Sequence, residues 1–255
     1  DSDELTMIAR AEDLDVATPL VANLNERPMD LQRWRRFGVG PHPGPDQGLP
    51  LIAFGHEVRS HLLGHLGLIG IREPFFPWYW GPGLPGYHQL DLPNAEPLSS
   101  TRKQGGISSY VHPVRARDPL ANAQGHADIP LELVADAVLG EVDTLEVACL
   151  WSDELGTSAL WYQLLNLGVP LAPSAGTDVM MNLYRNMAIG TTRIYVKVEA
   201  PMTFERYLSS LRAGKSFVKD AAYHKNAGTI GRSLLFSPGT NLPSSIPNYP
   251  ISIYR

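Results

Sequence analysis

Short apolar segments alternate with helical patterns along most of this chain, and this alternation limits the folds open to it. The strand-like segments are residues 15–24, 51–54, 66–71, 105–113, 141–151, 169–178 and 188–199. The helical patterns cover residues 3–14, 130–139, 156–168 and 203–214. The strand-like segments are largely apolar runs without a polar face, which is typical of parallel strands covered on both sides. The sequence therefore predicts an α/β fold on a parallel sheet, and we expect that sheet to close into a barrel.

Capping residues mark the ends of the last two predicted helices. Thr203 stands at the N-cap position of the final helix, which ends at Gly214. The helix before it has Thr157 or Ser158 available to cap its first turn and Gly168 at its end. Local signals therefore predict where both helices begin and end.

Proline and glycine separate the periodic part of the chain from irregular parts. Residues 25–50 and 72–100 are rich in both and predict long surface loops. Residues 221–255 show little periodicity and predict an irregular extension. We therefore divide the chain into a barrel domain, residues 1–220, and a C-terminal extension, residues 221–255.

Composition excludes several classes of partner. The chain has 255 residues, of which 44% are hydrophobic and 18% charged, as in globular proteins. The net charge is −5 without any basic tract, so we expect no nucleic-acid partner. No apolar stretch approaches the ~20 residues of a membrane helix, so we expect a soluble protein with no membrane partner. The compartment is left open between the cytoplasm and the periplasm or exterior after removal of a leader, and the oligomeric state is left open too.

Four side chains of the kinds that bind metals fall at the ends of predicted strands. They are Glu57, His65, His112 and Asp178. In a parallel barrel the strand ends meet at one mouth, where the loops carry the chemistry. Two carboxylates and two imidazoles suit one or two divalent ions, with Zn or Mn favoured and Fe as a further option. The sequence therefore predicts a hydrolytic metal site, with Asp178 also a candidate general base.

Three further residues are second-rank candidates. His61 lies four residues from two of the predicted ligands and is a candidate ligand itself. Arg59 and Arg185 are candidates to bind an anionic or carbonyl group of a substrate, with surface ion pairing as the alternative for each. His56 adjoins Glu57, and in a strand its side chain points to the opposite face.

Aromatic residues gather in the predicted loop at 75–87. They are Phe75, Phe76, Trp78, Tyr79, Trp80 and Tyr87. Two interpretations are open: they form an apolar wall for a substrate, or they pack over the end of the barrel and stabilise the loop. The first interpretation favours an aryl-bearing substrate.

The single cysteine, Cys149, lies in an apolar segment and is interpreted as a buried structural thiol.

Five segments carry a resemblance to a known family. They read, in order, GHEVRSHLLGHLGLIG, GGISSYVHP, ELVADAVLGEVDTLEV, WYQLLNLGVPLAPSAGTD and TFERYLSSLRAGKSFV. Over roughly residues 5–218 the chain resembles the CehA/McbA-type metallohydrolases of the PHP (polymerase and histidinol phosphatase) superfamily. The resemblance implies a distorted (β/α)7 barrel with divalent metals at the C-terminal mouth of the strands. On that pattern Glu57 looks like the metal-bridging carboxylate and His65 like a ligand in the next strand. His112 is similar to the histidine of a His-Pro motif, and Asp178 to the terminal aspartate.

The chain departs from that family pattern at its start and near Asp178. The family begins with a strand that carries His-x-His, and no His-x-His occurs in this sequence. The chain starts about where the following helix is expected, so we expect the first strand of the barrel to be missing from it. Many members have a histidine two residues after the terminal aspartate. Here that position is Met180, which removes one usual ligand.

The resemblance implies a metal-dependent hydrolase acting on a small molecule. Water activated by one or two divalent metals would attack the carbonyl of an ester or carbamate, and we expect the substrate to bear an aryl group. One alternative is a PHP-type phosphoesterase. The other is a non-catalytic barrel or ligand-binding module, which is favoured if the His-x-His strand is truly absent.

Overall fold

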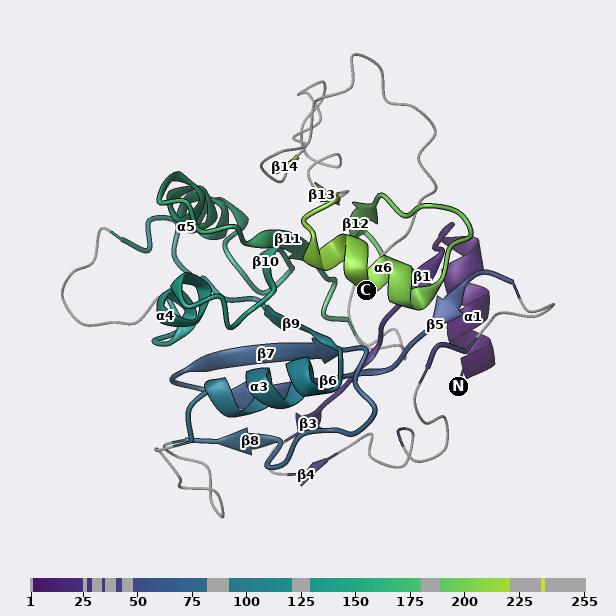
Figure 1. The fold of residues 1–255 in the computed structure, drawn as a ribbon, viewed down its shortest axis with the longest axis horizontal. Coiled ribbons are helices and arrows are strands. Elements are labelled where there is room, and N and C mark those ends of the chain that lie inside the picture. Colours follow the sequence, from purple (N-terminus) through teal and green to yellow (C-terminus); the bar gives the residue numbers. More distant parts are fainter. Residues whose placement is uncertain are drawn as a thin grey trace.

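The fold is seen in a computed structural model that describes most of the chain (Figure 1). The described residues are 2–24, 27–28, 34, 40–42, 48–81, 92–120, 129–179, 189–220 and 235–236. The C-terminal extension predicted for 221–255 therefore lies almost wholly outside the described residues, and its role as a separate unit stays a prediction.

A mixed sheet forms the centre of the molecule. Its strands run in the order β11 (Ala172–Ala175), β10 (Thr144–Ala148), β9 (Ile107–Tyr110), β7 (Gly64–Ile69), β6 (Gly55–Ser60) and β2 (Leu20–Val21). A further strand, β8 (Tyr79–Trp80), also pairs with β6. The pairs β11–β10, β10–β9, β6–β2 and β6–β8 are parallel. The α/β class predicted from the sequence is confirmed.

One part of the parallel prediction is wrong. The predicted strand at 51–54 does not pair with the one at 66–71. β7 pairs instead with β6, which was not predicted as a strand, and β6 and β7 form an antiparallel hairpin. The turn between them is too short for the crossover that a parallel pair needs. β7 is antiparallel to β9 as well. Among the described residues the strands form an open path from β11 to β2, so closure into a barrel stays a prediction.

Smaller sheets flank the central one. β1 (Val16–Ala17) pairs in parallel with β5 (Leu51–Ile52), and β3 (Asn23–Leu24) pairs with β4 (Arg27–Pro28). An antiparallel sheet contains β12 (Thr192–Val196), β13 (Ser216–Asp220) and β14 (Leu235–Phe236). It packs against β11, where the Ser216 hydroxyl donates to the Pro173 carbonyl at 3.2 Å.

The helices cover the sheet at several places. They are α1 (Ser2–Ala11), α3 (Ala95–Lys103), α4 (Leu133–Val138), α5 (Glu154–Asn166) and α6 (Phe204–Arg212). Figure 1 shows α4 and α5 on one side of the molecule and α1, with β1 and β5, on the other. All four predicted helices are confirmed, as α1, α4, α5 and α6. None of the helices in the described part of the chain is long and apolar enough to cross a membrane.

Helix α3 and one helix cap differ from prediction. Residues 72–100 were expected to be irregular throughout, but α3 begins at Ala95, and only Pro97, Leu98 and Thr101 of its residues are buried. That short apolar stripe explains why its periodicity is weak in the sequence. Helix α6 has the predicted cap, because the Thr203 hydroxyl accepts from the backbone N–H of Arg206 at 3.3 Å. Helix α5 is capped by Asp153 instead of Thr157 or Ser158, through the N–H of Gly156 at 2.8 Å.

The core decides between the two interpretations of the aromatic loop. Trp78, Tyr79 and Trp80 are at most 5% exposed and belong to the main hydrophobic cluster. Packing therefore explains these three residues, and they form no wall of an open substrate site. Phe76 is exposed, and Tyr87 lies outside the described residues. Cys149 is buried, as predicted.

Replacement of Asp15 is expected to stabilise the protein in a pH-dependent way. Burial, together with the charge of Asp13, raises the pKa of Asp15 to about 6. The folded state therefore binds this proton more tightly than the unfolded state, so ionisation of Asp15 lowers stability as pH rises from about 4 to about 6. Because Asp15 is partly solvated, Asp15→Asn should raise the free energy of unfolding by about 1 kcal/mol at pH 7.5 and leave it unchanged at pH 3.5. Urea titrations at both pH values, with the exposed Asp118→Asn as control, measure this. Destabilisation at pH 7.5 would contradict it.

Candidate metal centre

The hairpin of β6 and β7 places three polar side chains on one face of the sheet. Arg59 lies directly opposite His65 in the ladder, and Glu57 lies opposite Gly67. Side chains two residues apart on a strand share a face, so Glu57, Arg59 and His65 project to the same side. The His65 Nδ1 atom lies 3.2 Å from the Glu57 Oε1 atom. The side chain of His56 is fully buried, and its Nδ1 accepts from the N–H of Phe75 at 3.2 Å.

His112 joins this pair from the next strand. It follows β9 by two residues, and the N–H of Val111 donates to the His65 carbonyl at 3.2 Å, which continues the β7–β9 pairing. The His112 Nε2 atom lies 3.3 Å from the same Glu57 Oε1 atom. One ligand atom from each of Glu57, His65 and His112 lies within 4.8 Å of the other two. The antiparallel hairpin, and not a common edge of parallel strands, is what brings these groups together.

Glu57 is held as a carboxylate inside the protein. It is 4% exposed, and burial alone would raise its pKa. The hydrogen bonds with His112 and His65 and the positive charge of Arg59 instead hold the pKa well below its usual range. The Arg59 guanidinium donates to Glu57 Oε2 at 2.7 Å, while Oε1 faces the two imidazoles. The two carboxylate oxygens therefore have separate partners.

The two imidazoles are shifted in opposite directions. Burial lowers the pKa of His65, which favours the neutral ring with a nitrogen lone pair. Burial acts in the same direction on His112, but the hydrogen bond to Glu57 and the charges of Glu57, Glu146 and Asp178 raise its pKa overall. This negative field around His112 would equally favour a cation placed between the rings and the carboxylate.

Glu146 supports the site and was not among the residues predicted from the sequence. It lies in β10 and is 4% exposed, and its Oε2 accepts from the backbone N–H of His112 at 2.6 Å. Burial raises its pKa to about 7. Gly176 leaves room for it, because a Cβ there would collide with Glu146 Oε1. The available signal was that Glu146 is the one charged residue in the run from Thr144 to Trp151.

The backbone is unusual at two of the predicted site residues. His112 has φ of 34° and Asp178 has φ of 46°, both in the left-handed region that residues other than glycine rarely adopt. Asp13 is the third such residue in the described part of the chain. Strained conformations of this kind persist where the surrounding structure fixes them, and they are enriched at functional sites. The bond from His112 to Glu146 is one such constraint.

The remaining predicted site residues lie at the edge of the cluster or outside the described residues. The Asp178 side chain is 41% exposed, with Oδ2 4.0 Å from His112 Nε2. His61 is exposed in the hairpin turn, with its ring centre 5.6 Å from that of His65. Burial and the charges of Arg59 and Arg115 lower the His61 pKa. Arg185 lies outside the described residues, as does Met180.

The donor set fits a divalent metal ion. Two imidazole nitrogens and one carboxylate oxygen are a ligand set of catalytic zinc sites, in which the fourth position is left for water or substrate. The carboxylate is anionic, and one imidazole is held in its neutral form by burial, as metal ligation requires. Glu57, His65 and His112 therefore form a candidate site for one ion.

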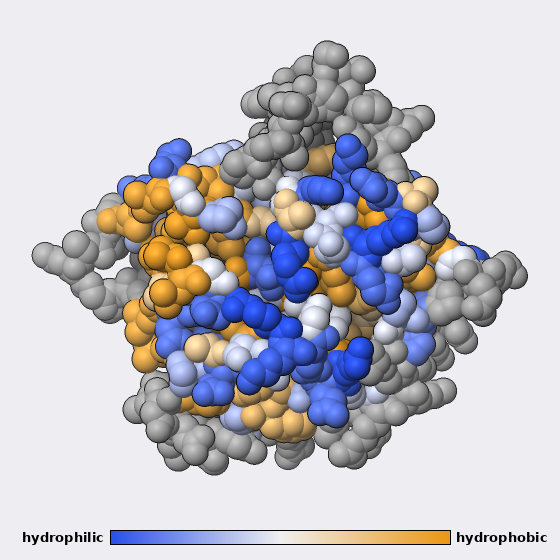
Figure 2. Space-filling view, in the orientation of Figure 1, coloured by the Kyte–Doolittle hydropathy of each residue, from blue (hydrophilic) through white to orange (hydrophobic). Residues whose placement is uncertain are grey.

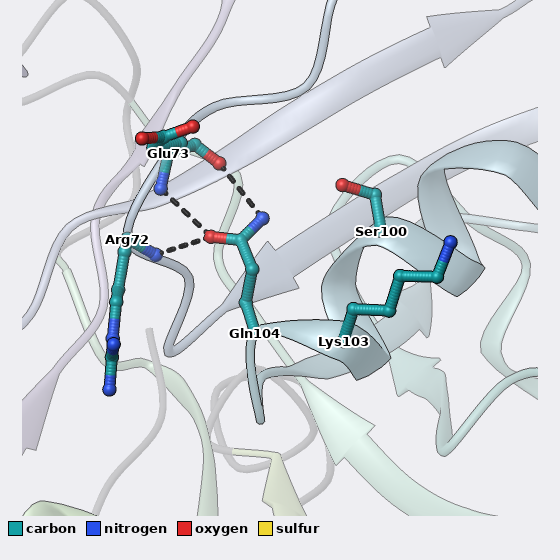
Figure 3. Close-up of a pocket in the computed structure, with 5 residues that line it drawn as sticks. All are labelled: Arg72, Glu73, Ser100, Lys103 and Gln104. Carbon is teal, nitrogen blue, oxygen red and sulfur yellow. Dashed lines mark hydrogen bonds between the residues drawn. The ribbon is translucent and has the colours of Figure 1, made fainter.

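A separate surface pocket lies between the loop after β7 and the C-terminal part of α3 (Figure 3). It is lined by Arg72, Glu73, Ser100, Lys103 and Gln104 and has a volume of about 430 Å³ (Figure 3). The Gln104 Oε1 atom accepts from the backbone N–H groups of Arg72 and Glu73 at 2.7 and 2.9 Å. In Figure 3 these bonds tie the loop after β7 to the end of α3. None of the metal-type residues of the candidate centre lines this pocket.

Comparison with known proteins gives structural likenesses only. No model of a known protein family matches the chain, and no curated protein matches it. One similar solved structure is a two-domain protein from Bacteroides vulgatus ATCC 8482, described as containing a predicted PHP-like metal-dependent phosphoesterase. The identity is 15%, the match covers 85% of this chain and 60% of that one, and the TM-score is 0.46. Another is PsfC from Pseudomonas syringae PB-5123, with 15% identity, coverage of 92% and 82%, and a TM-score of 0.49. At this level the likenesses assign neither a family nor an activity to the chain.

Proposed function

We propose that this protein is a metal-dependent hydrolase of the PHP type that cleaves a small-molecule ester or carbamate. The observation that carries the proposal is the position of Glu57 Oε1, which faces both His65 Nδ1 and His112 Nε2 at 3.2 and 3.3 Å in a buried site. Buried carboxylates and imidazoles that converge on one point are uncommon without a ligand or a catalytic role. The resemblance of the surrounding segments to CehA/McbA-type metallohydrolases supports the same class.

Each residue near the centre has a distinct role in this proposal. Glu57, His65 and His112 would hold the ion, Zn or Mn, and a bound ion would supply a water that ionises near neutral pH. Arg59 donates to Glu57 Oε2 and so fixes the orientation of that carboxylate, and its positive charge would stabilise negative charge that develops on a substrate oxygen. The carboxylate of Asp178 is exposed to solvent beside His112 and is the candidate general base. Asp178 and His61 would be the ligands of a second ion.

An exposed tryptophan beside the site supports a substrate with an apolar or aryl group. Trp151 is 45% exposed, and its indole N–H donates to the backbone carbonyl of Asp178 at 3.3 Å. Leu150, next to it, is 43% exposed. An indole fixed at the edge of a polar centre offers a flat apolar surface for part of a substrate.

A phosphoester is the second candidate substrate. The Arg59 guanidinium contacts Glu57, and the positive charges of Arg59 and Arg115 lower the pKa of His61 in the hairpin turn. Guanidinium groups suit the oxygen atoms of a phosphate. Activity assays with both kinds of substrate distinguish between the two candidates.

Removal and restoration of metal tests the proposed function. The 255-residue chain is treated with a chelator, then supplied with Zn or Mn, and assayed with an aryl carbamate, an aryl carboxylic ester and an aryl phosphate. We expect activity to fall at least about 100-fold on chelation and to return with metal, and we expect the carbonyl substrates to be cleaved faster than the phosphate. Activity undiminished by chelation would overturn the mechanism. Absence of activity and of bound metal would favour the non-catalytic alternative.

Truncation of Trp151 is expected to weaken binding of aryl substrates selectively. Trp151→Ala should raise KM for an aryl ester about 10-fold, because it removes stacking worth about 1.4 kcal/mol. It should change KM by less than about 2-fold for an analogue that carries a methyl group in place of the aryl group. Trp151→Phe keeps an aromatic surface and should retain most of the affinity. Phe76→Ala, at an exposed aromatic residue in the loop before Trp78, is the control. Equal effects of Trp151→Ala on both substrates would contradict this role.

A further inference from the structure

Helix α4 has apolar residues on both of its sides. Leu133 and Ala137 are buried in the core. Asp136 is 5% exposed and faces the interior, where it accepts from the Tyr110 hydroxyl at 2.6 Å. Val134 and Val138 face solvent with exposed fractions of 41% and 60%, and Leu139, directly after the helix, is 72% exposed. A surface helix of a globular protein normally turns its apolar stripe inward and its charges outward. The outer side of α4 therefore resembles a surface that is covered by another element.

Helix α5 extends this apolar surface. Leu160, Trp161 and Leu164 fill its buried side, as expected for a helix that packs on a sheet. Its exposed side carries Leu155, Ala159 and Tyr162 beside the uncharged polar residues Gln163 and Asn166, and residues 155–167 contain no charged side chain. Apolar side chains on both sides of a helix are typical of a helix that is covered on both sides. Helices α4 and α5 pack against each other, so their outer sides adjoin.

Together the outer sides of the two helices form one surface, which we call the α4–α5 patch. It consists of Leu131, Val134, Val138, Leu139, Leu155, Tyr162 and Leu167, each at least 41% exposed. Figure 2 shows apolar side chains gathered over α4 and α5, while the neighbouring surface is largely hydrophilic. These residues leave on the order of 700 Å² in water, which exceeds the largest apolar patch of a typical monomer and approaches the ~800 Å² per partner of a stable interface.

We propose that a second copy of this chain covers the α4–α5 patch and forms a two-fold symmetric homodimer. In such a dimer the same surface meets itself, so a patch with like charges would repel its copy. The residues that form this patch carry no charge, and the one charged residue of α4 points inward. Two helices from each copy can pack as ridges into grooves over the area available. The α4–α5 patch contains none of Glu57, His65 and His112, so the dimer does not rest on the proposed function.

Charge placed in the patch tests the dimer. Sedimentation equilibrium of the 255-residue chain from about 1 to 100 μM measures its mass in solution. We expect the wild type to have the mass of two chains and the double variant Val138→Glu/Leu139→Glu to have that of one, with dimer affinity weakened at least about 100-fold. Met7→Glu adds one negative charge at a 64% exposed apolar residue of α1, outside the patch, and should remain dimeric. Circular dichroism checks the fold of each variant.

Several outcomes would overturn this assignment. A wild type that is a single chain at about 100 μM would exclude the dimer, and a double variant that dimerises like the wild type would exclude this surface. Leu167→Glu covers the case in which the double variant fails to fold, because Leu167 lies beyond the last residue of α5 and is 77% exposed. It should also yield single chains, and a dimer with unchanged affinity would count against the proposal.

Discussion

Glu57→Gln is expected to lower both metal affinity and hydrolytic activity by at least about 100-fold, since loss of even an indirect partner of a metal ligand costs 10–100-fold. The substitution keeps the size of the side chain but removes the negative charge that faces His65 and His112. It also removes the charged partner of Arg59, whose guanidinium donates to Oε2 at 2.7 Å. Inductively coupled plasma mass spectrometry of the reconstituted protein measures bound metal, and the substrate panel above measures activity.

A matched substitution separates the role of Glu57 from a general effect of lost charge. Glu73→Gln removes a carboxylate from an exposed residue in the loop after β7, away from the three candidate ligands. We expect it to keep full metal content and activity. Glu57→Gln protein that folds normally and still binds one equivalent of metal with unchanged affinity would show that Glu57 is not a ligand.

Asn94→Ala is expected to destabilise the protein by about 3 kcal/mol, because it leaves several buried polar groups without a partner. Asn94 is completely buried, and its side-chain amide donates to the carbonyls of Leu63 and Gly64 and to the Tyr110 hydroxyl at 3.0–3.4 Å. It thereby connects the start of α3 with the hairpin turn and with β9. Because Gly64 directly precedes His65, we also expect metal affinity to fall about 10-fold, as for other residues that position a ligand.

Equilibrium unfolding in urea measures this change, with Asn166→Ala as the control at an exposed asparagine of α5. The control should change the free energy of unfolding by less than about 0.5 kcal/mol. An equally small effect of Asn94→Ala would show that water or neighbouring groups replace its hydrogen bonds. In that case Asn94 would not be what holds the hairpin in place.

Elements with strong periodicity could be predicted from the sequence, and weakly patterned ones could not. Helix α6 buries apolar side chains at helical spacing and α5 is rich in leucine between its cap and Gly168, whereas α3 buries so few side chains that it was expected to be loop. The direction of neighbouring strands could not be predicted from the apolar pattern either. The apolar run at 66–71 suits parallel and antiparallel neighbours equally, and only the short turn between β6 and β7 makes that pair antiparallel.

The candidate ligands could be predicted by residue type and position, but for a reason that was partly wrong. Glu57 was expected at a strand end, yet it lies within β6, and the pairing of β6 with β7 brings His65 to it. Glu146 was missed because its function depends on a contact with the His112 backbone, and no local pattern reports a contact between residues 34 apart. His61 has suitable chemistry and spacing, but the hairpin turn places it outside the three-residue cluster.

A zinc-soaked crystal, measured on both sides of the zinc absorption edge, tests the central claim most directly. We expect an anomalous difference peak within about 2.0–2.2 Å of His65 Nδ1, His112 Nε2 and a Glu57 carboxylate oxygen. The same soak of Glu57→Gln crystals should give no peak there. A wild-type crystal with no peak between these three side chains, or with its zinc bound only elsewhere, would contradict the assignment of this site as a metal centre.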